Sequence, residues 1–147
     1  EYRIIDTPGQ MEVFLYRDVG PKLGSSLDGR VVAVSLIDPG LIRRGSDLVA
    51  LRLTALMVEL RLGVAVVEAM SKSDSFGSDF LERLEKDMAG SLRAEGLSGE
   101  LAERLEAALS PVRRRRRVIS VSATGGEGME ELYKAVGESA CACGDQT

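Results

Sequence analysis

The fold is decided by residues 31–70, which read VVAVSLIDPGLIRRGSDLVALRLTALMVELRLGVAVVEAM. The stretch begins and ends with nearly continuous apolar runs, 31–37 and 64–70, that are rich in β-branched residues. Runs of this kind are typical of parallel strands that are covered on both faces. Asp38, Pro39 and Gly40 end the first run with turn chemistry. The stretch therefore predicts two parallel strands of one sheet.

The segment between the two runs has helical periodicity. Its apolar residues recur at three- and four-residue spacing and form one stripe: Leu48, Leu51, Ala55, Val58 and Leu62. The charged residues Arg52, Glu59 and Arg61 lie off this stripe. The pattern predicts a helix over 46–62, capped by Ser46 or Asp47 and ended by Gly63. The order of strand, helix and strand implies parallel pairing through a right-handed crossover.

The same alternation continues outside this stretch. Residues 3–5 resemble the end of a buried strand, and 118–121 predict a further strand. Helices are expected over 80–88, 99–109 and 127–139, with the first two joined by a Gly- and Ser-containing stretch at 90–98. A chain of 147 residues suits a single domain with a real core. The sequence predicts an α/β, three-layer fold with a mainly parallel sheet.

Composition excludes several classes of function. The chain has no His, which rules out His-based catalysis and His metal sites. Its net charge of −4 disfavours nucleic acid, and no apolar stretch is long enough for a membrane span. The five arginines at 113–117 could form a phosphate-binding patch, but a solvated approach to the next strand is favoured. Cys141 and Cys143 favour reduced thiols in a cytoplasmic protein.

The first motif that carries chemistry is Asp6-Thr7-Pro8-Gly9-Gln10, directly after the predicted strand at 3–5. A carboxylate at a strand end can hold Mg²⁺ through a water, because this small cation keeps part of its hydration shell. Gly9 lets a backbone N–H approach a terminal phosphate oxygen. Gln10 can orient an attacking water, as a Gln does in small GTPases. The alternative is a plain strand followed by a Pro-Gly turn.

The second motif is Ser71-Lys72-Ser73-Asp74, after the strand at 64–70. A carboxylate at Asp74 can accept hydrogen bonds from N1–H and the exocyclic amine of guanine. Adenine has no N1–H and would leave that carboxylate unpaired. Lys72 can lay its methylene groups along the base. A polar loop between a strand and a helix is the alternative reading.

The third motif is Ser122-Ala123-Thr124, after the strand at 118–121. Its small residues would let backbone N–H groups reach the guanine O6. Each motif alone is weak, but all three follow predicted parallel strands, whose carboxyl ends bind ligands in open sheets. Together they predict a guanine-nucleotide site of the GTPase type.

With these motifs, the chain resembles the GPN-loop GTPases, dimeric P-loop GTPases of archaea and eukaryotes, and most of all their archaeal members. The resemblance covers essentially the whole chain. It rests on these segments: 6–10 with Glu12 and Phe14, the helix end at 59–63, Pro111-Val112, the strand end at 121–123 and the tail at 141–145. It implies that Asp6 lies in the Mg²⁺ shell and that Gln10 and Glu12 help to place the hydrolytic water. It further implies that Lys72, Asp74, Ser122 and Ala123 bind guanine.

The resemblance also implies a homodimer that binds GTP and GDP, hydrolyses GTP with Mg²⁺ and acts as a switch in the assembly of a protein partner. The partner suggested by eukaryotic relatives is RNA polymerase. Two departures matter. The motif G-x-x-x-x-G-K-[ST] and the Gly-Pro-Asn loop are absent, and Ser71 stands where GTPases usually have Asn.

We therefore expect residues 1–147 to form the C-terminal two-thirds of a single GTPase domain that lacks the N-terminal P-loop unit. Alone, this chain is expected to bind GTP poorly and to turn it over negligibly. Ser71 is expected to weaken positioning of the base. The competing hypothesis is a non-catalytic protein-interaction module that retains the GTPase fold.

Overall fold

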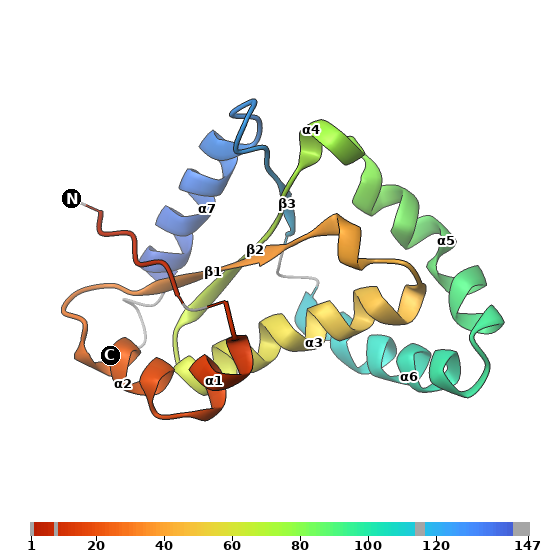
Figure 1. Cartoon of the computed structure of the whole chain (residues 1–147), viewed down its shortest axis with the longest axis horizontal. Helices are drawn as coiled ribbons and strands as arrows, with labels where there is room; N and C mark the ends of the chain where they lie inside the picture. The colour runs from red at the N-terminus through yellow and green to blue at the C-terminus, as the bar shows by residue number, and fades with distance from the viewer. Residues whose placement is uncertain (1, 8, 114–116, 143–147) are drawn as a thin grey trace.

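A parallel sheet forms the middle layer of the computed structural model, which describes residues 2–7, 9–113 and 117–142 (Figure 1). Its strands β1 (Val32–Ile37), β2 (Ala65–Met70) and β3 (Ile119–Ser120) lie in the order β1-β2-β3. The ladder between β1 and β2 runs from Val32 opposite Ala65 to Ile37 opposite Met70. The strands predicted at 31–37 and 64–70 are confirmed, and the one predicted at 118–121 is present in shorter form.

The helices account for most of the remaining described chain. In order they are α1 (Met11–Tyr16), α2 (Val19–Ser26), the 3₁₀ turn η1 (Pro39–Leu41), α3 (Gly45–Leu62), α4 (Ser73–Phe76), α5 (Phe80–Ala94), α6 (Gly96–Arg113) and α7 (Met129–Ala142). The predicted helix at 46–62 is confirmed as α3. The stretch at 90–98, expected to be a connection, is largely helical, because α5 and α6 meet in a tight turn at Gly96, whose φ is +60°.

The two faces of the sheet are covered by different helices. Both α3 and α7 pack on β1 and β2, and Figure 1 shows them on opposite sides of the sheet. Because side chains alternate along a strand, Val67 and Ala69 of β2 pack with Leu132 of α7, whereas Val66 and Met70 face α3 and its neighbours. The α5–α6 pair packs against α3. These layers form the predicted three-layer α/β fold.

The two ends of α3 are fixed by local chemistry. Gly63 has φ +66° and donates its N–H to the Glu59 carbonyl, so it ends the helix as predicted. At the start, the N-cap is Arg44, and neither Ser46 nor Asp47 occupies that position. Asp47 instead reaches back from inside the first turn and accepts N–H groups of Arg43 and Arg44 at 2.9 and 3.0 Å. Asp47, the third residue of α3, thus satisfies the N–H groups of the two residues directly before the helix.

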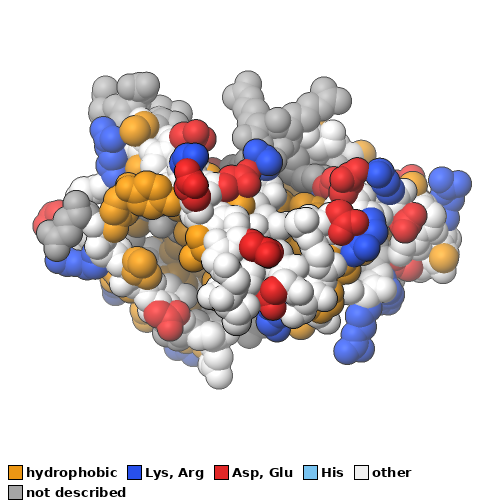
Figure 2. Space-filling model, turned by 90° about the horizontal axis from the view of Figure 1, so that it is seen from above, with side chains coloured by type: hydrophobic (Ala, Val, Ile, Leu, Met, Phe, Trp, Pro, Cys, Tyr) orange, Lys and Arg blue, Asp and Glu red, His pale blue; other side chains and the backbone are white. Residues whose placement is uncertain are grey.

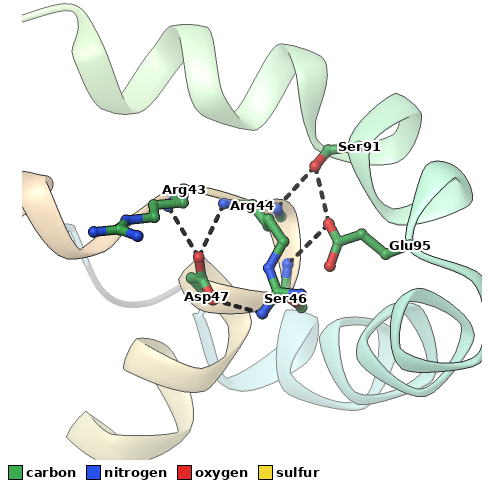
Figure 3. A network of polar contacts seen from close by, with 7 residues as sticks. Arg43, Arg44, Ser46, Asp47, Ser91 and Glu95 are labelled. Atoms are coloured by element: carbon green, nitrogen blue, oxygen red, sulfur yellow. Dashed lines mark hydrogen bonds and ion pairs between the residues drawn. The ribbon is translucent and has the colours of Figure 1, made fainter.

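The C-terminal part of α5 supplies further acceptors at this helix start (Figure 3). The hydroxyl of Ser91 accepts the N–H of Gly45 at 2.9 Å, and Glu95 accepts that of Ser46 at 3.4 Å. Ser91 also donates to Glu95 at 3.0 Å. Hydrogen bonds from Ser46 and Ser91 lower the pKa of Glu95, which keeps it anionic beside the positive end of α3. This contact fastens the α5–α6 pair to the central helix.

A buried arginine joins the same three helices. The side chain of Arg52, on α3, is only 2% exposed and donates to Glu85 of α5 at 2.5 Å and to Glu106 of α6 at 2.8 Å. The apolar stripe of α3 did not predict the burial of Arg52, because the stripe marks only one covered face and α5 and α6 cover a second face of the helix. Arg52 therefore lies inside the molecule although it lies off the predicted apolar stripe.

The predicted strand at 3–5 is wrong for this structure. Residues 2–7 form no regular element, Ile4 is 95% exposed, and Ile5 is exposed as well. A strand needs a neighbour to take its backbone hydrogen bonds, and within the described residues β1 pairs with β2 alone. The segment is held by a ring contact between Tyr2 and Tyr133 of α7, at 5.3 Å between centroids. On the outer strand β1, Val34 and Leu36 are exposed.

The described surface carries charged side chains of both signs. Figure 2 shows acidic and basic side chains interspersed on the face seen from above, with hydrophobic side chains between them. Of the arginine run, residues 114–116 lie outside the described residues, and Arg117 pairs with Glu131 at 2.7 Å. Cys143 also lies outside them, whereas Cys141 is a free, exposed thiol. Among the described residues, no helix is both long and apolar enough to cross a membrane.

Candidate functional site

Three loops meet where the parallel strands end. Asp38 directly follows β1, Lys72 and Asp74 follow β2, and Ser122 follows β3. Two contacts join them across the sheet: Lys72 Nζ lies 2.6 Å from Asp38 Oδ2, and Ser122 Oγ donates to Asp74 Oδ1 at 2.7 Å. The structure thus brings two of the three predicted motifs together, at the sheet edge where open parallel sheets bind ligands.

Asp74 is exposed but firmly oriented. Its Oδ1 accepts the hydroxyl of Ser122, and its Oδ2 accepts that of Ser75 at 3.2 Å. The hydrogen bond from Ser122 is the main cause that lowers the pKa of Asp74, so the group is a carboxylate at neutral pH. The N–H of Asp74 itself and the hydroxyl groups of Ser75 and Thr124 lower the pKa further. Because the residue is exposed, this carboxylate remains accessible from solvent.

Ser122 is the fixed point of this arrangement, with none of its surface exposed. Because Asp74 can only accept, the single hydroxyl proton of Ser122 is donated to it. The oxygen of Ser122 in turn accepts the N–H of Gly125 at 2.9 Å and lies 3.0 Å from the Thr124 hydroxyl, which acts as donor. Every position around the Ser122 oxygen is filled, so the orientation of Asp74 is set from the buried side. Ala123 is exposed beside it.

The β3–α7 loop is held against β2 and α4 by backbone contacts. Ser73 donates its N–H to the Val121 carbonyl at 3.1 Å, and its hydroxyl donates to Glu127 at 3.4 Å. The N–H of Ser122 is bonded to the Glu127 carbonyl at 3.0 Å. Gly128, with φ +71°, passes so close that an added Cβ would lie 1.9 Å from the Ser120 carbonyl oxygen. Only glycine allows the loop to turn back this tightly.

Ser71, the residue noted for replacing Asn, is used within the sheet. Its hydroxyl and its N–H both donate to the Ile37 carbonyl, at 3.1 and 2.9 Å. The side chain therefore ties the end of β2 to the end of β1. Asp38 begins its turn directly after that carbonyl, so Ser71 also fixes the spacing of the two loops.

The first motif lies apart from the other two. Asp6, Gly9 and Gln10 are exposed, and Pro8 lies outside the described residues. Figure 1 shows the segment before α1 crossing near the start of β1, away from α4 and the β3–α7 loop. Gln10 is the N-cap residue of α1, and Glu12 lies in the first turn of that helix. The structure places these predicted catalytic residues on one short segment but does not join them to Lys72 and Asp74.

Asp38, Thr124 and Glu127 are site residues that sequence reasoning missed. Asp38 was read only as part of a turn, although its position directly after a predicted parallel strand was a signal. Thr124 was quoted within its motif without a role. Glu127 gave no signal, because its contact with Ser73 depends on how tightly the β3–α7 loop folds back.

Comparisons with known proteins agree with this geometry. Residues 1–142 match the model of a family described as a conserved hypothetical ATP binding protein. A GPN-loop GTPase of Pyrococcus abyssi is 32% identical over 154 aligned positions, which cover 100% of this chain and 62% of that protein. The crystal structure of a GTPase from the same organism, in its apo form, matches with a TM-score of 0.79 and 30% identity, over 94% of this chain and 58% of that chain.

This chain belongs to the GPN-loop GTPase family. A more distant GPN-loop GTPase, from Arabidopsis thaliana, is 25% identical over 146 positions, or 95% of this chain and 38% of that protein. The family and the P-loop GTPase fold predicted from the sequence are confirmed. The chain spans less than two thirds of the length of these curated relatives.

Proposed function

We propose that this protein binds GTP and GDP and hydrolyses GTP with Mg²⁺. The observation that carries the proposal is the oriented, ionised carboxylate of Asp74 at the end of β2, in a chain of the GPN-loop GTPase family. A guanine ring offers two adjacent donors, N1–H and the exocyclic amine. An exposed carboxylate, which only accepts hydrogen bonds, is complementary to that pair of donors.

The surrounding residues support guanine over adenine. Ser122 prevents Asp74 from rotating, because its own hydrogen bonds are all satisfied. The methylene groups of Lys72 provide an apolar surface for the base, and Ala123 leaves room for a backbone N–H to reach its O6. An adenine at this place would present its N1 lone pair to the carboxylate, and the two acceptors would repel.

Mg²⁺ fits the first motif in a limited way. Among the described residues, no group of three or more His, Cys, Asp or Glu side chains gathers as a metal site. Mg²⁺ is commonly held by one or two carboxylates together with waters and phosphate oxygens, and the exposed carboxylate of Asp6 suits that role. When bound, the ion would neutralise charge that develops on the phosphates.

Hydrolysis would rest mainly on positioning. In this proposal Gln10 and Glu12 orient the attacking water, and the Gly9 N–H contacts the terminal phosphate. These three residues precede or begin α1, so a movement of that short helix would carry them together. By its resemblance to the family, the protein would act as a cytoplasmic homodimer and as a switch in assembly of a protein partner, with RNA polymerase as the suggested client.

The base site can be tested on this chain with nucleosides, which need no phosphate contacts. We expect guanosine, added to the ¹⁵N-labelled chain, to shift the backbone NMR signals of residues 72–75 and 122–125, and adenosine to leave them in place. Asp74→Asn should abolish the preference for guanosine, because an amide donates where the guanine N1–H needs an acceptor. Exposed Asp28→Asn is the matched control. Equal shifts with guanosine and adenosine would favour the non-catalytic interaction module.

Catalysis needs a separate measurement. The sequence contains no G-x-x-x-x-G-K-[ST] motif, and that loop supplies much of the phosphate affinity in P-loop proteins. We expect no GTP hydrolysis above background by these 147 residues in a single-turnover assay with Mg²⁺. Turnover that disappears in Gln10→Ala would show that the phosphate site is complete without that loop.

A further inference from the structure

We propose that Asp38 is a positioning residue that holds the ammonium group of Lys72 away from Asp74 and so keeps the Asp74 carboxylate open to the guanine base. This inference rests on the proposed function, because Asp74 is assigned to the base there. Asp38 itself does not touch the nucleotide. Its role is to decide which of two nearby carboxylates the lysine pairs with.

The competition arises from the sequence. Lys72 is the N-cap residue of α4 and Asp74 lies in that helix, so the two exposed, oppositely charged residues are only two positions apart. A lysine and a carboxylate this close attract each other, and a second carboxylate within reach competes for the same ammonium group. In the structure that second carboxylate is Asp38, 2.6 Å from the ammonium, and within the described part of the chain no ion pair links Lys72 to Asp74. Both oxygens of Asp74 accept serine hydroxyl groups instead.

Asp38 is well placed to hold the lysine. Its Oδ1 accepts the N–H of Gly40 at 2.9 Å, which fixes the carboxylate at the start of η1, and its Oδ2 is left for Lys72. The hydrogen bond from Lys72, aided by that from Gly40, lowers the pKa of Asp38. Its side chain is 37% exposed, less than the 56% of Lys72, so the anchor is the better-shielded partner. The pair also bridges the ends of β1 and β2.

The backbone of Lys72 supports a specific role for its side chain. The φ angle of Lys72 is +61°, and every other described residue with a positive φ is a glycine. An L residue in this conformation is strained, and strain of this kind is concentrated at functional sites. From this position the ammonium group of Lys72 reaches Asp38 at the end of β1. A glycine would satisfy the backbone but could not provide the cation or the methylene surface.

Asp38→Asn is the informative substitution, because its amide oxygen can still accept the Gly40 N–H while the negative charge is lost. We expect the freed ammonium of Lys72 to pair with Asp74 and to lower the pKa of Asp74 further, as followed by ¹³C NMR of its carboxyl carbon. We also expect guanosine affinity to fall by about two- to fivefold, in keeping with an exposed ion pair. Asp38→Glu should restore both properties in part, and Asp28→Asn should change neither.

A double variant separates this role from a merely structural one. Asp38→Asn combined with Lys72→Met removes the competing charge but keeps an unbranched side chain beside the base. It should recover guanosine affinity relative to Asp38→Asn alone. An unchanged pKa of Asp74 in Asp38→Asn would overturn the inference, whether or not guanosine binds. Absence of guanosine binding by the unmodified chain, with the shift in the pKa of Asp74 still present, would instead overturn the proposed function.

Discussion

Replacing Arg52 by Ala should destabilise the protein strongly, because it breaks a buried network between α3, α5 and α6. The Arg52 side chain is 2% exposed, Glu106 is 15% exposed and Glu85 is 40% exposed. Removing one partner of a buried ion pair costs about 3–5 kcal/mol, since a charge is left without compensation. Glu85 can be rehydrated at its surface position, so Glu106 carries most of the cost. We therefore expect the lower end of that range, about 3 kcal/mol.

The assay is urea unfolding followed by circular dichroism. With a slope of about 1–3 kcal/mol per M for a small domain, the midpoint should fall by at least about 1 M. Arg104→Ala is the matched control on α6, because Arg104 pairs with Glu100 four residues away and both are largely exposed. That change should cost about 0.5 kcal/mol or less. A midpoint for Arg52→Ala equal to that of Arg104→Ala would refute the reasoning.

Four further changes test local features. Gly63→Ala forces a Cβ into the left-handed region at the end of α3 and should lower the thermal midpoint, at a cost of about 1 kcal/mol. Gly90→Ala, inside α5 with open space for a Cβ, should raise the thermal midpoint, and calorimetry can measure both variants. Ser122→Ala should raise the pKa of Asp74 toward its ordinary value in an NMR titration, because the bond from Ser122 is the main cause of its lowering. The pKa of Asp47 is also lowered, by the Arg43 N–H above all. The contribution of Asp47 to stability is therefore complete above its unfolded pKa of about 4 and is lost as the pH falls through its folded pKa. In acid unfolding measurements, the free energy of unfolding of Asp47→Asn should fall less steeply with pH in that range.

Much of the central architecture could be predicted because its determinants are local. The apolar runs at 31–37 and 64–70 and the stripe between them need no distant partner to be recognised, and Gly63 marks a helix end by its own chemistry. The residues predicted to bind guanine were found in the same way, because Lys72, Asp74 and Ser122 each follow a recognisable strand. Their meeting then follows from parallel pairing.

The remaining features depend on distant contacts that the sequence does not display. Arg52 is buried because α5 and α6 supply carboxylates from positions far along the chain. Residues 3–5 have strand-like composition, yet no strand among the described residues pairs with them, and Ile4 is exposed. Asp38 has the composition of a turn, and its pairing with Lys72 is visible only when the ends of β1 and β2 are aligned by their register.

The parallel arrangement of the sheet also affects the rate of folding. Among the three described strands no two form a β-hairpin, since β1 reaches β2 through α3 and β2 reaches β3 through α4, α5 and α6. The strands therefore cannot pair by extension from a tight turn, and each pair of strands forms only after a long segment of chain has closed into a loop. Early formation of α3 would shorten the first of these loops. The speed at which the sheet appears should thus follow the helical content of residues 45–62 in the unfolded chain.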